Sequence, residues 1–158
     1  MKTKILKPVI ICILSIGVLV KCAKKDDTDE IIQVRYGTSF GFCLGYCKKD
    51  LTLKSGTETI TASGWNDTIV TKTCTETLEN SSWDSLKTGL DITTFFTLPV
   101  TIGCPDCADG GAEWLELKLA NGNSHRVTFE YNNEPEVLKD YIPELRDFMR
   151  EAGKCTGN

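Results

Sequence analysis

The chain has 158 residues, of which 41% are hydrophobic and 25% charged, the balance of one globular domain rather than of a disordered chain. Four of its 18 basic residues lie in the first 21 positions, which contain no acidic residue. The remaining 14 basic residues stand against 22 acidic ones, a net charge of −8 over residues 22–158. Such an acidic body argues against nucleic-acid binding, and a single His leaves little room for acid–base catalysis.

Residues 1–21 predict an export signal. A basic start, Met1–Lys7, precedes an uncharged apolar run of 13 residues, Pro8–Val20. That run has the length of a signal-peptide core and is too short for a comfortable membrane span. Cys22 follows directly, and the arrangement resembles a bacterial lipoprotein signal, although Lys21 stands where that family carries a small residue. The resemblance implies cleavage before Cys22 and a lipid, such as palmitate, on that residue.

Residues 22–30 predict a solvated tether, because they are charged and contain no apolar side chain beyond Ala23. The segment resembles the short lysine-then-acidic export tag of surface lipoproteins in Bacteroidota-type bacteria. The resemblance implies a protein anchored by lipid to the outer membrane and exposed at the cell surface. Residues 31–158 then form a single domain.

Six cysteines remain in the domain: Cys43, Cys47, Cys74, Cys104, Cys107 and Cys155. An even number in an exported domain predicts disulfides, with 15 possible pairings. We expect the distant pair Cys74 and Cys155 to join, which leaves the other four to pair among themselves.

Three other interpretations of the cysteine regions stay open. The spacing Cys43-x3-Cys47 with Cys104-x2-Cys107 would serve a structural zinc ion. Cys104 and Cys107 could instead form a thioredoxin-like redox pair, but the sequence after them starts no helix. Asp106 and Asp109 could bind Ca²⁺, although a solvated turn explains them more simply. We predict disulfides, no metal and no cofactor.

The first half of the domain predicts strands. Ile31–Tyr36 is the first, Leu51–Leu53 the second and Thr59–Ala62 the third, with a β-prone Thr68–Leu78 after them. A two-residue Gly56-Thr57 loop of type II′ would pair residue 53 with 60 and residue 51 with 62, so that the apolar residues share one face.

The middle of the domain predicts a short helix and a hairpin. Ser81-x-x-Asp84 fits a capping box, and Trp83, Leu86 and Leu90 form an apolar stripe. Residues 97–111 read as a loop. A three-residue loop, 121–123, would then pair residue 119 with 125 and residue 117 with 127, with the left-handed conformation at Asn123. This places His125 beside Leu119 as a partly covered structural residue.

The last segment predicts a helix. Pro135 suits its first turn, and apolar residues recur at helical spacing from Leu138 to Ala152 until Gly153 ends the pattern. Pro143 predicts a kink or a restart. The expected fold is α+β: an antiparallel β-sheet of about six strands in two hairpin groups, with two helices packed on one face.

The segment around the first cysteine pair, Gly41–Cys47, leads into Leu51-Thr52-Leu53 and Ser55-Gly56. It resembles a family of short bacterial proteins of unknown function that share a C-x-G-x-C motif before a strand and a glycine turn. The resemblance implies an exported α+β domain and no activity.

We therefore expect a non-catalytic module that binds or inhibits an extracellular protein or glycan. Its candidate contacts are the aromatic residues near the first cysteine pair (Tyr36, Phe40, Phe42 and Tyr46) and an exposed Trp114. The alternative is an envelope thiol-disulfide or zinc protein that uses the pairs Cys43/Cys47 and Cys104/Cys107.

Overall fold

One β-sheet organises the domain in the computed structural model, which describes residues 29–65 and 69–154. Its seven strands are β1 Ile31–Ser39, β2 Lys48–Lys54, β3 Thr57–Ser63, β4 Lys72–Glu76, β5 Thr101–Ile102, β6 Ala112–Leu119 and β7 Ser124–Glu130. They lie in the order β4-β3-β2-β1-β6-β7-β5. All neighbours are antiparallel except β5 and β7. The predicted α+β class is confirmed, with one short parallel strand that the sequence analysis assigned to a loop.

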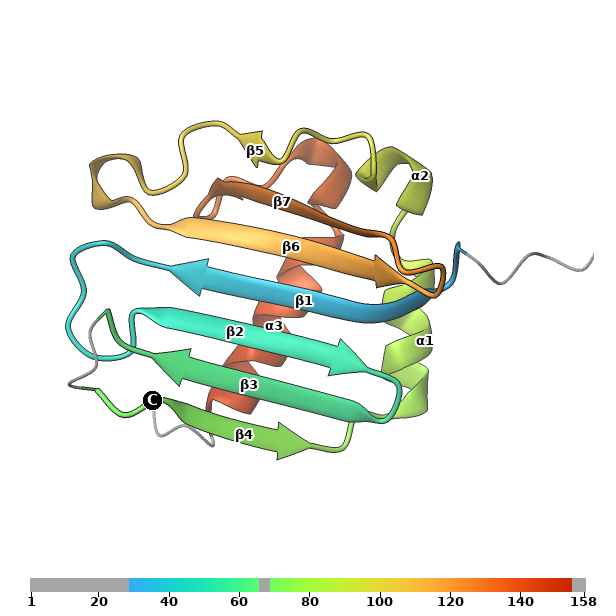
Figure 1. The fold of residues 1–158 in the computed structure, drawn as a ribbon, viewed down its shortest axis with the longest axis horizontal. Helices are drawn as coiled ribbons and strands as arrows, with labels where there is room; N and C mark the ends of the chain where they lie inside the picture. Colours follow the sequence, from blue (N-terminus) through green and yellow to red (C-terminus); the bar gives the residue numbers. More distant parts are fainter. Residues whose placement is uncertain (1–28, 66–68, 155–158) are drawn as a thin grey trace, which may run out of the picture.

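The helices lie on one side of this sheet. They are α1 Asn80–Thr88, α2 Ile92–Phe95 and α3 Tyr141–Gly153, with short 3-10 turns η2 Cys107–Asp109 and η3 Glu136–Leu138. α3 crosses behind the central strands. α1 lies at the right end of the sheet, away from the β1–β2 connection at the left (Figure 1). None of the described helices covers the other face of the sheet. The core therefore fills the space between the sheet and α1 and α3.

Alternation along the strands puts the predicted apolar set into this core. Leu51, Leu53 and Ile60 are fully buried, and so are Leu115 and Leu117. The predicted registers of both hairpins are nevertheless wrong by two residues: Leu51 pairs with Ile60, and Leu117 pairs with His125. A shift of two residues preserves the face that each side chain occupies.

Glycine placement explains both register shifts. The first turn uses Ser55 and Gly56, and Gly56 has φ +72°. The second has a three-residue loop of Ala120–Gly122 in which Gly122, with φ +89°, takes the left-handed position predicted for Asn123. Glycine adopts positive φ without the steric cost that asparagine would meet, so the loop begins one residue earlier than predicted.

The two predicted helices form with different ends. α1 begins at Asn80 after Glu79, so the capping box expected at Ser81 is not formed, although Trp83, Leu86 and Leu90 are buried as predicted. α3 restarts at Tyr141 and holds Pro143 in its first turn, where the missing N–H removes no helical hydrogen bond. Gly153 is the last residue of α3 rather than the residue after it.

Candidate binding site

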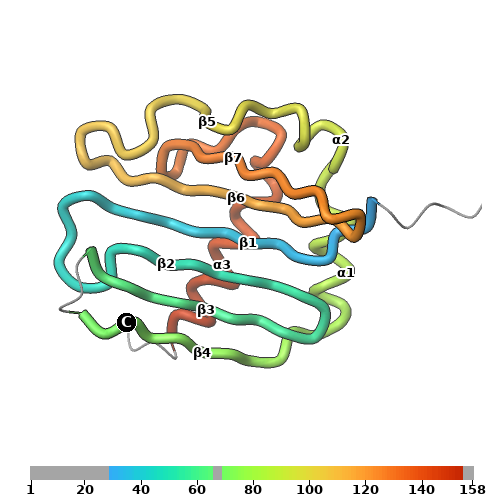
Figure 2. The backbone as a smooth tube through the Cα atoms, in the orientation of Figure 1, coloured from blue at the N-terminus to red at the C-terminus, as the bar shows by residue number. Residues whose placement is uncertain are grey.

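Both local cysteine pairs are closed and lie in neighbouring loops. Cys43 is disulfide-bonded to Cys47, and Cys104 to Cys107, each with 5.5 Å between the Cα atoms. The amide of Gly41 donates to Asp106 Oδ1 at 3.3 Å, which joins the two loops. The β1–β2 and β5–β6 connections thus meet at one end of the sheet (Figure 2).

The remaining cysteine predictions rest partly on positions outside the described residues. Cys74 is disulfide-bonded, and its predicted partner Cys155 lies outside the described residues, as does the predicted lipidation site Cys22. Within the described ranges no group of three or more His, Cys, Asp and Glu side chains could hold a metal ion. Cys104 precedes a short 3-10 turn rather than an α-helix.

The loop closed by Cys43 and Cys47 holds two large apolar side chains in solvent. Phe42 is 95% exposed and Leu44 is 103% exposed. The loop is pinned by its disulfide and by the amide of Phe40, which donates to the carbonyl oxygen of Cys47 at 3.1 Å. Its apolar tip is therefore presented on a short, covalently closed segment.

Residues of the β3–β4 connection form hydrogen bonds with this loop. The Tyr46 hydroxyl donates to the carbonyl oxygen of Val70 at 3.3 Å, and Trp65 Nε1 donates to the carbonyl oxygen of Phe40. Trp65 and Val70 are themselves exposed. We call residues 40–47, with the supporting Trp65 and Val70, the loop end.

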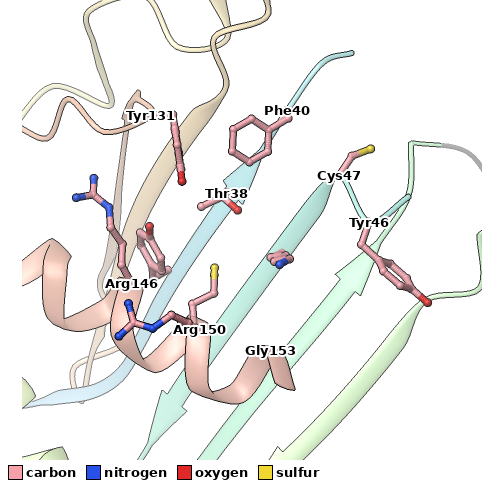
Figure 3. Close-up of a pocket in the computed structure, with 11 residues that line it drawn as sticks. Thr38, Phe40, Tyr46, Cys47, Tyr131, Arg146, Arg150 and Gly153 are labelled. Atoms are coloured by element: carbon pink, nitrogen blue, oxygen red, sulfur yellow. The ribbon is translucent and has the colours of Figure 1, made fainter. Parts of the chain in front are cut away.

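Beneath the loop end lies a pocket of about 490 Å³ between the sheet and the last turns of α3. Phe40, Tyr46 and Tyr131 line it from the loops, while Met149 and Arg150 line it from α3 (Figure 3). Its other lining residues are Tyr36, Thr38, Cys47, Lys49, Arg146 and Gly153. The pocket therefore joins the sheet, the helix and the first disulfide.

A polar row crosses the core face of the sheet beside the pocket, and two of its members, Thr38 and Lys49, line the pocket. Thr38 of β1 pairs with Lys49 of β2 on one side and with Glu113 of β6 on the other. The next row inward, two residues along each strand, is hydrophobic around Tyr36 and Leu51. The core face of the sheet thus changes from apolar to polar between two neighbouring rows of side chains at this end.

Glu113 is fully buried and belongs to a network with Arg146. Arg146 Nε and Nη2 donate to its two oxygens at 2.9 and 2.6 Å, and the Tyr36 hydroxyl donates to Oε1 at 2.8 Å. Arg146 also bonds Glu134 at 2.6 Å. The hydrogen bond from Arg146 lowers the pKa of Glu134, whereas burial and the negative charge of Glu113 raise the pKa of Tyr36.

The predicted aromatic contacts divide into three groups. Tyr36 belongs to the core, Phe40 and Tyr46 are half-buried at the pocket, and Phe42 alone stands in solvent. The predicted exposure of Trp114 is wrong, because the residue is only 9% exposed.

Trp114 is covered on the helix-free face of the sheet. Its ring lies over Gly37 of the neighbouring strand, where an added Cβ would come within 2.2 Å of it. The Arg126 guanidinium carbon is 3.9 Å and the Arg35 carbon 5.2 Å from the ring centroid. This packing makes Trp114 a structural residue rather than a free contact.

His125 is half-buried, as predicted, but lies opposite Leu117 rather than Leu119. Its Nε2 is 2.9 Å from the carbonyl oxygen of Leu98, and its ring packs edge-on against Phe95 with centroids 5.4 Å apart. It lies away from the pocket lining.

Sequence reasoning missed the pocket residues Lys49 and Arg150. Lys49 stands two residues before the buried Leu51, so strand alternation would have placed it on the core face. Arg150 follows Met149 by one residue in α3, and nothing local distinguishes it from the other charged residues of that helix.

Comparisons with known proteins add no identity: a scan of family models found no match, and a search of curated proteins found no relative. Among the described helices none is long and apolar enough to traverse a membrane.

Proposed function

We propose that the protein is a cell-envelope lipoprotein whose domain is a non-catalytic binding module. The signal pattern before Cys22 supports export and a lipid anchor. The charged tether, residues 22–30, supports exposure of the domain at the cell surface. Its partner in this proposal is an extracellular protein or glycan.

The observation that carries the binding proposal is the exposure of Phe42 and Leu44 on a disulfide-closed loop. Large apolar side chains in water cost free energy unless a partner covers them, and a contiguous apolar patch marks interaction sites. A covalently closed loop loses little conformational entropy on binding, because its shape is fixed in advance. A rigid apolar tip is therefore suited to insertion into a partner's pocket.

The experiment is site-specific photo-crosslinking in cells that produce the full chain. A benzophenone side chain replaces Phe42 in one version and Val100, which is 65% exposed away from the loop end, in the control. We expect a defined adduct from position 42 and none from position 100. Equal crosslinking from both positions, or none from either, contradicts the proposal.

The lipid anchor is tested separately, by feeding the cells an alkyne-tagged palmitate. We expect the wild-type chain to carry the label and the Cys22→Ser variant to lose it. Retention of the label in that variant contradicts the predicted lipidation site.

The alternative function is an envelope thiol-disulfide protein, and the exposure of both Cys104 and Cys107 supports it. Exposed disulfides are the ones most open to exchange. Insulin reduction by the wild-type chain that is lost in Cys104→Ser/Cys107→Ser would favour this alternative. Absence of insulin reduction in the wild-type chain favours the binding module.

A further inference from the structure

We propose that the pocket beneath the loop end binds a small organic anion with one negative charge and a flat apolar body, such as an aromatic carboxylate. This site is distinct from the exposed tip at Phe42 and Leu44. The proposal rests on three features: the charged lining residues are cationic, the Lys49 side chain has no partner among the described residues, and aromatic rings form the pocket walls.

The charged side chains that line the pocket are all cationic. They are Lys49, Arg146 and Arg150, and no carboxylate stands among the described lining residues. Arg146 is already bonded to Glu113 and Glu134. Arg150 pairs with Asp147 at 2.8 Å. One cation, Lys49, is left over.

The side chain of Lys49 has no hydrogen bond or ion pair with any described residue. It is half-buried and lies on the core face of β2, between Thr38 and Ala62 of the neighbouring strands. A partly covered lysine that faces a pocket gains when an anion pairs with it, because the pair offsets the water that the lysine has lost. The ammonium of Lys49 therefore lacks the acceptor that a carboxylate of a ligand would supply.

The charge count limits the ligand to a monoanion. Because only Lys49 lacks an ion pair among the described lining residues, a second negative charge on the ligand would have to draw Arg146 or Arg150 away from its carboxylate partner. An uncompensated charge in a partly enclosed site carries a desolvation cost. A phosphate monoester dianion is accordingly a poorer fit than a carboxylate.

The walls of the pocket fit a flat apolar body. Phe40 and Tyr131 pack edge to face with ring centroids 4.8 Å apart, and Tyr46 and Met149 complete the apolar surface. Thr38 lies between Phe40 and Tyr131 on one side and Arg150 of α3 on the other (Figure 3). A volume of about 490 Å³ lies within the range of small-molecule sites, and aromatic rings favour stacking or edge contacts with a planar ligand.

The test uses two fluorescent probes that share one body. The anion is 8-anilinonaphthalene-1-sulfonate, and its neutral counterpart is N-phenyl-1-naphthylamine, which lacks the sulfonate. Each is titrated into the wild-type chain, into Lys49→Gln and into Lys54→Gln. Lys54 is the matched control, because it is exposed at the far end of β2 and its loss removes the same charge.

We expect one site for the anionic probe and an affinity about tenfold lower in Lys49→Gln, the worth of one charge-assisted contact. The neutral probe should bind that variant within twofold of the wild type. Lys54→Gln should bind both probes as the wild type does. Equal affinity of the two lysine variants for the anionic probe would overturn the proposal.

A measurement on the wild-type chain keeps the test valid if Lys49→Gln folds poorly. The anionic probe should shift the backbone amide resonances of Thr38, Lys49 and Met149 in a ¹⁵N correlation spectrum. Shifts confined to Phe42 and Leu44 would place the probe on the loop tip and overturn the pocket.

The double variant Phe42→Ser/Leu44→Ser separates the two proposals. It should bind the anionic probe as the wild type does, because neither position lines the pocket. Loss of the probe in this variant would mean that the probe reports the tip rather than the pocket.

Discussion

The strongest test of the polar end of the core is the substitution Arg146→Met. Glu113 is 0% exposed, and Arg146 supplies two of the three hydrogen bonds to its carboxylate described above. Methionine keeps the apolar stem of the side chain but removes the guanidinium. The buried charge then keeps one donor, the hydroxyl of Tyr36.

The expected loss of stability is about 3 kcal/mol. Removing one partner of a buried ion pair costs roughly 3–5 kcal/mol, because the other charge stays behind uncompensated. The side chain of Arg146 is 25% exposed, so water can reach part of the site, and we expect the lower end of that range. Against a total of about 5–15 kcal/mol for a domain, the variant stays folded, with Tm lower by roughly 10 °C.

The assay is urea unfolding under non-reducing conditions, followed by circular dichroism. The matched control is Arg150→Met, one turn later in α3, where the arginine pairs with Asp147 and both side chains are about two-thirds exposed. An exposed pair contributes about 0–1 kcal/mol. The double variant Glu113→Gln/Arg146→Met should recover part of the loss, because it removes the buried charge. A loss below about 1 kcal/mol in Arg146→Met, or one equal to that of the control, would refute the reasoning.

Two further predictions concern the sheet. Gly37→Ala should destabilise the domain by about 1–3 kcal/mol and change the near-UV circular dichroism of Trp114, because the added methyl group would overlap its ring; an unchanged spectrum would contradict this packing. Glu76→Gln should stabilise the domain by about 0.5 kcal/mol at pH 7 and by nothing at pH 3, since Glu76 faces Glu58 across β3 and β4. Burial and the charge of Glu76 raise the pKa of Glu58, so its ionisation opposes folding as pH rises through that value; equal urea midpoints for Glu76→Gln and wild type at pH 7 would count against it.

The sequence predicted those features of the fold that depend on a single strand, above all which of its faces is buried. Leu115, Leu117 and Leu119 alternate with polar residues, and a period of two fixes the buried face whatever the register. The register itself depended on which residue took positive φ, and the local pattern did not favour Gly122 over Asn123. The short parallel strand β5 carries only Thr101 and Ile102, too few residues for a periodic signal.

The candidate site was predictable only in its loop. The spacing of Cys43 and Cys47 around aromatic residues marked the segment, and the structure puts an exposed apolar tip there. The pocket needs residues from β1, β2 and α3, and the pair Glu113–Arg146 spans 33 positions. Contacts of that separation follow from topology, which single-sequence patterns do not determine.

The two short disulfides contribute more to the shape of the loop end than to the stability of the sheet. Closing a loop of five residues, as Cys43 and Cys47 do, lowers the entropy of the unfolded chain by an amount worth about 2 kcal/mol. The core between the sheet and the helices buries more than twenty hydrophobic side chains, each worth about 1.5–3 kcal/mol on transfer from water. The core therefore supplies the main favourable contribution to folding, whereas Phe42 and Leu44 depend on the disulfide for a fixed position in solvent. This division of labour is what a binding loop on a rigid scaffold requires.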